Sequence, residues 1–348
     1  MCKKIFAVLA LLLTSAMLWA GETYNFMMIS DTHFGSEASF GPSPAPKIQK
    51  KLKRCDQAVP NFRAMFSHMV KTSDQATKFL IHAGDIIEGY GFNAEAQAGQ
   101  FFMADTLLKE YIKLPIYMVR GNHEVGGKTG GKEGYFNTIA PAIAKNAGQP
   151  ADTIHYTVTC GEDLFIFVDG YRNPGEFLRN TLKNLAKRPR YIFLVIHQDV
   201  IPQPHQFLLD LIKQLLPYDG IILNGHTHRN RVLKYVRDGH TVTQYTIGSY
   251  VIADTAKMRY ESTKNDTAAF LKKFRNAKYV ATPERKQLFD AEFAPFIQGY
   301  QEFNALKGHS TAAGYARIKV SDAGITVLVQ SADLSQKPFE IKLIDKQK

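Results

Sequence analysis

Short apolar runs alternate with longer stretches of helical spacing along the first two thirds of the chain. The segments 23–33, 78–90 and 114–124 are runs that end in polar residues, which predicts buried strands leading into loops. Between them, 61–73 and 95–112 carry apolar residues at the spacing of amphipathic helices. The same pattern then predicts strands at 161–170, 190–199 and 220–228 and helices at 176–187 and 207–216.

This alternation of strand and helix predicts an α/β layered fold. Histidine, aspartate and asparagine recur where the predicted strands end, as in the sequence "NGHTHRN" at 224–230. Open α/β sheets bind their ligands at the carboxyl ends of the strands. The pattern therefore places the candidate chemistry at one edge of the sheet.

The last third of the chain has a different pattern. Residues 232–253 predict hairpin strands, and 254–308 are charged with interspersed aromatics, which predicts a helical insertion. Strands return at 314–345, and they need a sheet to join, so we expect one domain over 21–348. The insertion aromatics are interpreted as the apolar side of packed helices. The alternative is a lid that stacks on a nucleobase or a fatty group.

The N-terminus has the pattern of a signal peptide over residues 1–20. Lys3 and Lys4 precede an apolar run and small residues follow it, with cleavage expected after Ala20 or, alternatively, after Ala16. The apolar run is short for a membrane span, although an uncleaved anchor is the alternative. No other segment is long and apolar enough to span a membrane, so we expect a secreted or periplasmic protein.

Composition narrows the class of ligand only slightly. The 348 residues are 45% hydrophobic, which allows a substantial core, and their formal net charge is +11. The positive charge favours anionic ligands such as phosphates or nucleotides; a nucleic-acid footprint is an alternative that charge alone does not favour. After removal of the leader Cys55 and Cys160 remain, and the sequence leaves open whether they pair or stay as free thiols.

Five short polar motifs follow predicted strands in order along the chain. They are Asp31 and His33 in "SDTH", Asp85 in "AGDIIE", Asn122, His123 and Glu124 in "GNHE", His197 in "VIHQD", and His226 and His228 in "NGHTH". A lone histidine is usually a satisfied core residue, and that interpretation applies to His68, His82, His155 and His205, with His240 exposed at a turn. Five motifs in order are hard to explain as core histidines.

The chemistry of these residues indicates a dinuclear metal centre. Imidazole and carboxylate together suit divalent ions such as Zn, Fe and Mn, and no thiolate accompanies them. Two ions need a bridging carboxylate, and they would polarise phosphoryl oxygens and supply a metal-bound hydroxide near neutral pH. A histidine that binds no metal can donate a proton to the leaving oxygen.

The ordered set Asp-x-His, Gly-Asp, Gly-Asn-His-Glu, His and Gly-His-x-His resembles the calcineurin-like metallophosphoesterase family, over residues 31–228. Purple acid phosphatases, phosphoprotein phosphatases and cyclic-nucleotide phosphodiesterases belong to this group. The resemblance implies a four-layer αββα sandwich, in which two mixed β-sheets are flanked by helices.

The resemblance also implies a role for each motif residue. Asp31, His33 and His228 would hold one metal ion. Asn122, His197 and His226 would hold the second, with Asp85 bridging both. His123 would be the histidine near the substrate, oriented by Glu124. Many relatives carry a further acidic residue after the Gly-Asp, and Glu88 fills about that place.

The sequence therefore predicts a hydrolase of phosphate esters with two divalent or trivalent metal ions (Mn, Fe or Zn), acting on a small-molecule monoester or diester. One alternative is a secreted nuclease or nucleotidase of the same group, with the basic loop 47–54 gripping a polyanion. A second is a non-catalytic metal-binding envelope protein. Tyr90, Phe92 and Tyr250 are expected as pocket walls, and Phe34 as an apolar wall. The sequence does not indicate the oligomeric state.

Overall fold

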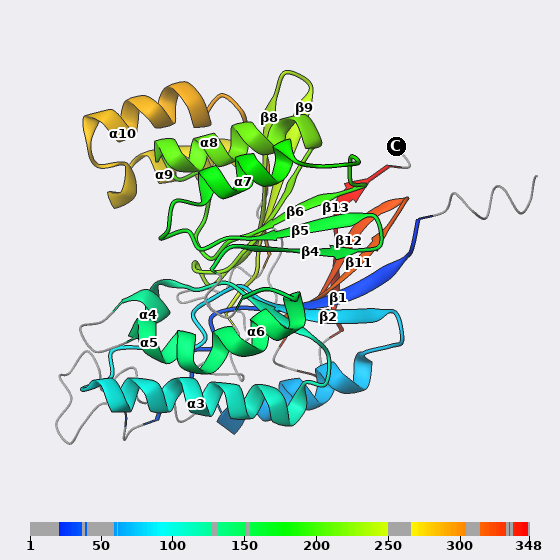
Figure 1. Ribbon diagram of the computed structural model, residues 1–348. Helices are drawn as coiled ribbons and strands as arrows, with labels where there is room; N and C mark the ends of the chain where they lie inside the picture. Colours follow the sequence, from blue (N-terminus) through cyan, green and yellow to red (C-terminus); the bar gives the residue numbers. More distant parts are fainter. Residues whose placement is uncertain are drawn as a thin grey trace, which may run out of the picture.

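The computed structural model describes residues 21–36, 39, 59–60, 62–126, 131–150, 154–249, 266–303, 314–331, 334 and 337–346 (Figure 1). The predictions for the leader, the basic loop 47–54, Cys55 and Tyr250 lie outside these residues. Cys160 is a free thiol in the described structure. No helix of the described chain combines the length and apolar character that a membrane crossing needs.

Two mixed β-sheets form the centre of the molecule. The six-stranded sheet has the order β13-β12-β11-β1-β2-β3, with β1, β2 and β3 parallel to one another and the others antiparallel. Its strands are β1 (Tyr24–Ile29), β2 (Thr77–His82), β3 (Ile116–Met118), β11 (Gly314–Ser321), β12 (Gly324–Ser331) and β13 (Phe339–Asp345).

The seven-stranded sheet has the order β10-β8-β9-β7-β6-β5-β4. Its strands β5, β6, β7 and β9 run parallel, whereas β4, β8 and β10 pair antiparallel with their neighbours. The strands are β4 (Tyr156–Cys160), β5 (Asp163–Phe167), β6 (Ile192–Val195), β7 (Ile221–Asn224), β8 (Asn230–Arg237), β9 (His240–Thr246) and β10 (Ile297–Phe303).

The two sheets pack face to face through aromatic side chains. Phe26 of β1 lies edge-on to Phe165 of β5 and Phe193 of β6, with ring centroids 5.3 and 5.9 Å apart. Alternation along β5 explains this, because Phe165 belongs to the cluster between the sheets and Ile166 belongs to the cluster on the outer face. Burial on both faces accounts for the continuous apolar runs in the sequence.

Helices cover the outer faces of both sheets and complete the four layers (Figure 1). A helix over 62–72, α3 (Ala94–Tyr111) and α6 (Ala140–Ala147) lie on the six-stranded sheet. On the seven-stranded sheet lie α7 (Pro174–Lys183), α8 (Gln206–Leu215), α9 (Thr267–Arg275) and α10 (Pro283–Leu288). The remaining short helices are α4 (Asn122–Val125), α5 (Gly131–Gly134), η2 (Tyr135–Ile139), η3 (Leu216–Tyr218), η5 (Lys278–Val280) and η6 (Phe289–Phe293). The predicted αββα sandwich is confirmed.

The segment 254–308 is not wholly helical as predicted. Its described part, 266–303, contains α9 and α10 but ends in strand β10, which pairs antiparallel with β8 at the sheet edge. Phe289 and Phe293 are buried under the helices, and Tyr300 stacks on Phe270 at 4.2 Å. In this part Phe289, Phe293 and Tyr300 are on the apolar side of packed elements, as interpreted, whereas Tyr279 is 43% exposed.

Candidate functional site

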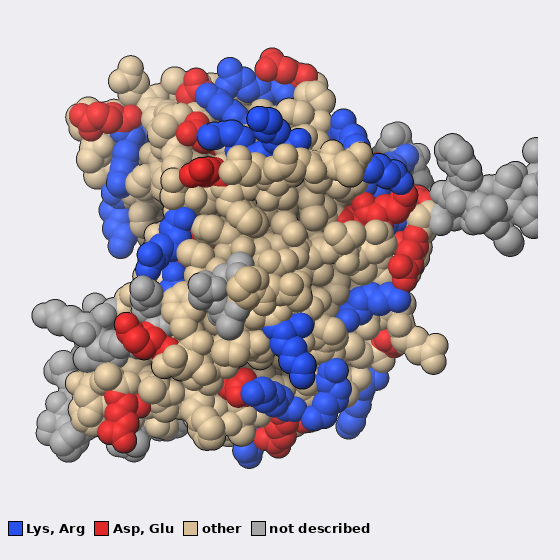
Figure 2. Space-filling view, in the orientation of Figure 1, with Lys and Arg blue, Asp and Glu red and all other residues tan. Residues whose placement is uncertain are grey.

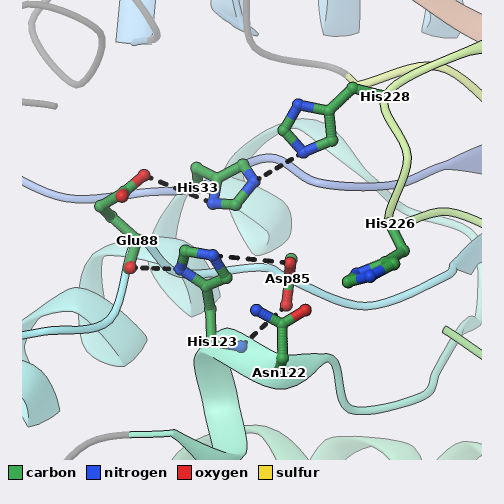
Figure 3. Close-up of a pocket in the computed structure, with 7 residues that line it drawn as sticks. All are labelled: His33, Asp85, Glu88, Asn122, His123, His226 and His228. Carbon is green, nitrogen blue, oxygen red and sulfur yellow. Dashed lines mark hydrogen bonds and ion pairs between the residues drawn. The ribbon is translucent and has the colours of Figure 1, made fainter. Parts of the chain in front are cut away.

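The predicted site residues lie at the carboxyl ends of five strands. Asp31 follows β1, Asp85 follows β2, and Asn122 begins α4 just after β3. His197 follows β6, and His226 follows β7. These strands belong to both sheets, so residues almost 200 positions apart in the sequence converge on one pocket (Figure 3).

Asp31, His33 and His228 form one cluster. Oδ1 of Asp31 lies 3.1 Å from Nε2 of His228 and 3.9 Å from Nε2 of His33. The two imidazole Nε2 atoms face each other at 3.2 Å. One candidate ligand atom from each residue lies within 4.8 Å of the others, which is close enough for a shared ion.

A second cluster contains Asp85, His197 and His226. Oδ2 of Asp85 lies 3.2 Å from Nε2 of His197, which is itself 3.3 Å from Nδ1 of His226. The amide oxygen of Asn122 also lies 3.3 Å from Nε2 of His197. The side chains named for the second ion in the sequence prediction are therefore neighbours.

Asp85 lies between the two clusters. Its carboxylate groups with His197 and His226 on one side and with His33 and His123 on the other, each set within 4.8 Å. Oδ2 of Asp85 is 3.8 Å from Nε2 of His123, and Oδ1 accepts a hydrogen bond from the backbone N of His123 at 2.9 Å. This central position suits a carboxylate shared by two ions.

The donor atoms fit metal ions better than they fit one another. Oδ1 of Asp31 is buried and accepts no hydrogen bond from the described residues. A buried carboxylate oxygen without a donor is costly unless a cation balances it. Imidazole nitrogens also meet in pairs, and the set of nitrogen and oxygen donors without sulfur suits Zn, Fe or Mn.

Burial and charge shift the pKa values of these groups in opposite directions. Burial, together with His123 and His228, holds the pKa of His33 well below its usual value, and burial also lowers the pKa of His226. Burial opposes the charged form of His197, yet the carboxylates of Asp85 and Asp31 raise its pKa to about 10. For Asp85 burial is outweighed by His197 and His123, which lower the pKa of that carboxyl group.

The backbone at the site is strained. Five of the seven candidate ligands have left-handed backbone torsions, with φ between 47° and 71°: Asp31, His33, Asp85, His226 and His228. Such torsions are uncommon for residues other than glycine. Packing around the ligands is close, because a Cβ atom on Gly121 would clash with Oδ1 of Asp85. Strain of this kind clusters at functional sites.

Hydrogen bonds to the backbone of neighbouring loops hold the candidate ligands in position. Nδ1 of His197 lies 2.7 Å from the carbonyl oxygen of Ala83, a contact in which Nδ1 donates and Nε2 is left facing Asp85. Oδ2 of Asp31 accepts a hydrogen bond from the backbone N of His226 at 2.9 Å. This bond joins the loops that follow β1 and β7.

The sequence resemblance implies that Glu124 orients the ring of His123, but the hydrogen bonds of its carboxylate in the described structure are to the backbone. Its fully buried carboxylate accepts hydrogen bonds from the backbone N of Asp85 (2.9 Å), Gly121 (2.6 Å) and Ile87 (3.1 Å). Burial and the charge of Asp85 raise the pKa of Glu124 to about 7, against these hydrogen bonds. Glu124 thus ties the Asp85 loop to the start of α4.

Glu88 contacts the imidazole of His123, which the sequence resemblance assigned to Glu124, and also contacts the imidazole of His33. Its carboxylate lies 3.3 Å from Nδ1 of His33, and its carbonyl oxygen accepts a hydrogen bond from Nδ1 of His123 at 2.5 Å (Figure 3). One buried residue therefore orients both imidazoles. The signal was its spacing after Gly-Asp, which the sequence analysis noted without assigning these contacts.

The pocket has a volume of about 140 Å³ and its lining is polar (Figure 3). Its lining residues are His33, Asp85, Glu88, Asn122, His123, His226 and His228. Phe34 is not a wall, because it is fully buried and packs edge-on against Phe62 at 4.3 Å. Tyr90 contacts His123, with ring centroids 5.3 Å apart, and Phe92 is 55% exposed nearby in the sequence.

The histidines interpreted as structural lie outside the two clusters. His82 is buried, with Nε2 3.0 Å from the Thr32 hydroxyl, and His68 contacts the hydroxyl of Tyr315 at 2.8 Å. His155 accepts from the backbone N of Asp169 at 3.1 Å. His205 precedes α8, and His240 begins β9 beside a turn.

Sequence reasoning missed a buried polar network behind His197 and His226. Asp199 pairs with Arg231 at 2.7 Å, and its other oxygen accepts from Asn224 at 2.9 Å and from Gln244 at 3.2 Å. All four side chains are buried. The only signal in the sequence was an acidic residue two positions after His197 in "HQD".

Solved structures share this fold at low sequence identity. A purple acid phosphatase from yellow lupin (Lupinus luteus) seeds matches with a TM-score of 0.52 and 12% identity, covering 92% of this chain and 54% of the lupin chain. The chain thus spans about half the length of that structure. A dimetal phosphatase from Danio rerio matches with a TM-score of 0.49 and 10% identity, over 92% of this chain and 99% of that one.

Comparison with curated protein sequences gave no match. The identities to solved structures show a common fold and nothing further. Residues 24–230, by contrast, match the family described as calcineurin-like phosphoesterase, and that match contains every candidate ligand. Because it also covers more than half of the chain, this protein belongs to the calcineurin-like phosphoesterase family.

Proposed function

We propose that the protein is a metal-dependent hydrolase of phosphate esters, acting on monoesters or diesters of small molecules. Members of its family are hydrolases of this class. The observation that carries the proposal is the placement of Asp85, whose carboxylate lies between two clusters of nitrogen and oxygen donors. Side chains that serve only to stabilise the core have no reason to converge in this way.

We assign the ligands as the sequence resemblance implies. Asp31, His33 and His228 would hold one ion, and Asn122, His197 and His226 the other, with Asp85 between them. The grouping of ligand atoms within 4.8 Å supports this division. Bound metal ions of this kind supply Lewis-acid polarisation of phosphoryl oxygens and lower the pKa of water, and Zn, Fe and Mn all suit the donors.

His123 is proposed as the proton donor to the leaving oxygen. Its Nδ1 contacts the carbonyl oxygen of Glu88, so the N–H there is held by the protein. Nε2 points toward Asp85 and the pocket, with a side chain only 13% exposed. A protonated His123 would donate from Nε2 to an ester oxygen, and general acid catalysis of this kind contributes about 10²–10⁴-fold in rate.

The experiment removes metal from the protein, restores Mn, Fe or Zn, and measures hydrolysis of an aryl phosphodiester and an aryl monoester. Asp85→Asn keeps the size of the side chain but removes its charge and serves as the inactive control. We expect activity that returns with metal and is lost in the variant. Two bound metals per chain with no turnover of either ester, or of nucleotides, would favour a non-catalytic metal-binding protein.

A nuclease or nucleotidase is the second candidate. The formal net charge of +11 favours an anionic substrate, and the face drawn in Figure 2 carries Lys and Arg side chains interspersed with Asp and Glu. The small polar pocket would accept a phosphate group of any of these compounds. Binding to a polyanion would weaken steeply as salt is raised, with several phosphates neutralised at once. Flat salt dependence of KM would favour a small-molecule ester.

We further propose that the leader 1–20 is removed and that the protein acts outside the cytoplasm, in the periplasm or the medium. The backbone N of Gly21 donates to Oδ2 of Asp322 at 2.7 Å, so a free amino group there would meet a carboxylate. This contact supports cleavage after Ala20. Mass spectrometry of the protein from the extracytoplasmic fraction would test it, and a chain that retains residues 1–20 would contradict it.

A further inference from the structure

The segment 88–92, between β2 and α3, holds an exposed tyrosine against the proposed proton donor. The ring of Tyr90 is edge-on to the ring of His123, with an interplanar angle of 87°. Tyr90 is 49% exposed. The contact places an aromatic surface beside the rim of the pocket.

The backbone here adopts a conformation that tyrosine disfavours. Gly89 and Tyr90 are left-handed in succession, with φ of 67° and 55°. For a residue with a Cβ atom this conformation costs about 1–2 kcal/mol. Gly89 is also required by packing, because a Cβ there would lie 2.8 Å from the carbonyl oxygen of His123. The position of Tyr90 is therefore held against its backbone preference.

A buried amide side chain holds the strained peptide. Oε1 of Gln100 on α3 accepts from the backbone N of Gly89 at 2.8 Å, and its Nε2 donates to the Gly89 carbonyl oxygen at 3.3 Å. Gln100 is fully buried, so these bonds are made away from water. On the other side, the carbonyl oxygen of Glu88 is bound by His123. The ring of Tyr90 is thus presented rigidly at a site where chemistry is proposed.

We propose that Tyr90 is the platform on which the leaving group of the ester packs, and that this group carries a flat unsaturated ring such as an aryl ring or a nucleobase. This inference rests on the proposed function. The leaving group is attached to the oxygen that receives the proton from His123. It therefore lies next to that imidazole, and hence beside Tyr90. Aromatic pairs gain about 0.5–1.5 kcal/mol beyond burial, in edge-on or offset geometry.

A saturated chain fits this surface less well. All seven residues that line the pocket are polar, so its described lining offers a saturated chain no apolar contact. The further exposed aromatic in the same segment is Phe92, which again favours ring-shaped ligands. The proposed substrates are therefore aryl or nucleoside phosphates, with the ring held outside a small polar pocket.

The test compares phenyl and ethyl esters of phosphate in the metal-loaded enzyme, as kcat/KM. Tyr90→Leu removes the ring, Tyr90→Phe keeps it, and Phe102→Leu removes an aromatic that is 69% exposed elsewhere on α3. We expect Tyr90→Leu to lower kcat/KM about tenfold for the phenyl ester, from roughly 1.4 kcal/mol of ring packing, and less than about twofold for the ethyl ester. Tyr90→Phe should keep most of the phenyl-ester activity that Tyr90→Leu loses, and Phe102→Leu should match the wild type on both esters.

Two kinetic outcomes would overturn the proposal. An equal loss on both esters in Tyr90→Leu would mean that the ring only positions His123. A loss in Tyr90→Phe as large as in Tyr90→Leu would mean that the hydroxyl group is what acts. Thymidine 5′-monophosphate, added as a third substrate, separates a nucleobase from an aryl ring, since the deoxyribose holds the base farther from phosphorus.

Binding distinguishes this inference from the proposed function. If the reloaded wild type hydrolyses none of these esters, the proposed function fails, and titration calorimetry with phenylphosphonate and methylphosphonate still examines the platform. A dissociation constant that rises about tenfold for phenylphosphonate alone in Tyr90→Leu supports it. Equal affinities of the variant and the wild type for phenylphosphonate would overturn it.

Discussion

Replacement of Glu124 by glutamine separates two roles for this residue. The sequence assigned it to the ring of His123, whereas the structure gives it three backbone N–H donors, on Asp85, Gly121 and Ile87. Glutamine has one oxygen that can accept and one NH₂ group that cannot. The NH₂ group would face at least one of these donors in a fully buried position.

The cost follows from the three hydrogen bonds. If the amide oxygen keeps the bonds from Asp85 and Gly121, the N–H of Ile87 loses its acceptor, which costs about 1–3 kcal/mol for a buried donor. The two retained bonds lose the charge of the acceptor, roughly 1 kcal/mol each. We therefore expect Glu124→Gln to lower the free energy of unfolding by about 3–5 kcal/mol, a large part of the usual 5–15 kcal/mol.

Urea unfolding of the metal-free protein measures this cost, because no ligand contributes there. His123→Ala is the matched control, since it removes one hydrogen bond and should cost less than about 1.5 kcal/mol. Metal affinity of Glu124→Gln should also fall about 10- to 100-fold, as Asp85 loses its support. Unchanged unfolding of metal-free Glu124→Gln, with activity lost, would refute the reasoning and restore a role on His123.

Three further changes test other parts of the structure. Asp199→Asn leaves Arg231 buried without the carboxylate that pairs with it, and it should lower the free energy of unfolding in urea by about 3–5 kcal/mol. Asp238 is exposed, so Asp238→Asn should change this free energy little. Equal effects of the two changes would contradict the buried pair. Phe289 is buried and Tyr279 is exposed, so Phe289→Ala should lower the free energy of unfolding by about 3–5 kcal/mol and Tyr279→Ala by less than about 0.5 kcal/mol. A Phe289→Ala variant as stable as the wild type would argue against the packing of the insertion. Chelation should lower the free energy of unfolding by about 4 kcal/mol per metal site, relative to protein at a free metal concentration 1,000 times Kd, and the thermal midpoint should fall with it. A midpoint indifferent to chelator would indicate that the clusters bind no ion.

The parts of the fold that the sequence predicted are those with strong periodicity. The runs that became β2 and β6 and the spacing that became α3 are local properties of the chain, and the ends of those strands located the chemistry. Strand β10 was missed because its sequence "IQGYQEF" is short and polar, and it becomes a strand by pairing with β8 at a sheet edge. Tertiary pairing of this kind leaves little local signal.

The candidate ligands could also be predicted from local sequence motifs, but the residues that hydrogen-bond to them could not. A motif such as "GNHE" names residues, but the partner of each side chain depends on loops that approach from elsewhere in the chain. The carboxylate of Glu124 accepts from the backbone of the Asp85 loop, and Glu88 contacts the imidazole of His123. Both contacts arise because the loop after β2 lies against the start of α4. The Asp199–Arg231 pair joins positions 32 residues apart and has no motif.

The left-handed torsions of the candidate ligands have a consequence for how the site can change by mutation. At about 1–2 kcal/mol each, the five residues together work against stability by roughly 5–10 kcal/mol, as much as many domains have in total. Replacement of one of these residues by glycine would relieve the strain there while it removes a ligand. An intact set of these residues in one chain is then a sign of selection for what the site does, independent of selection for folding.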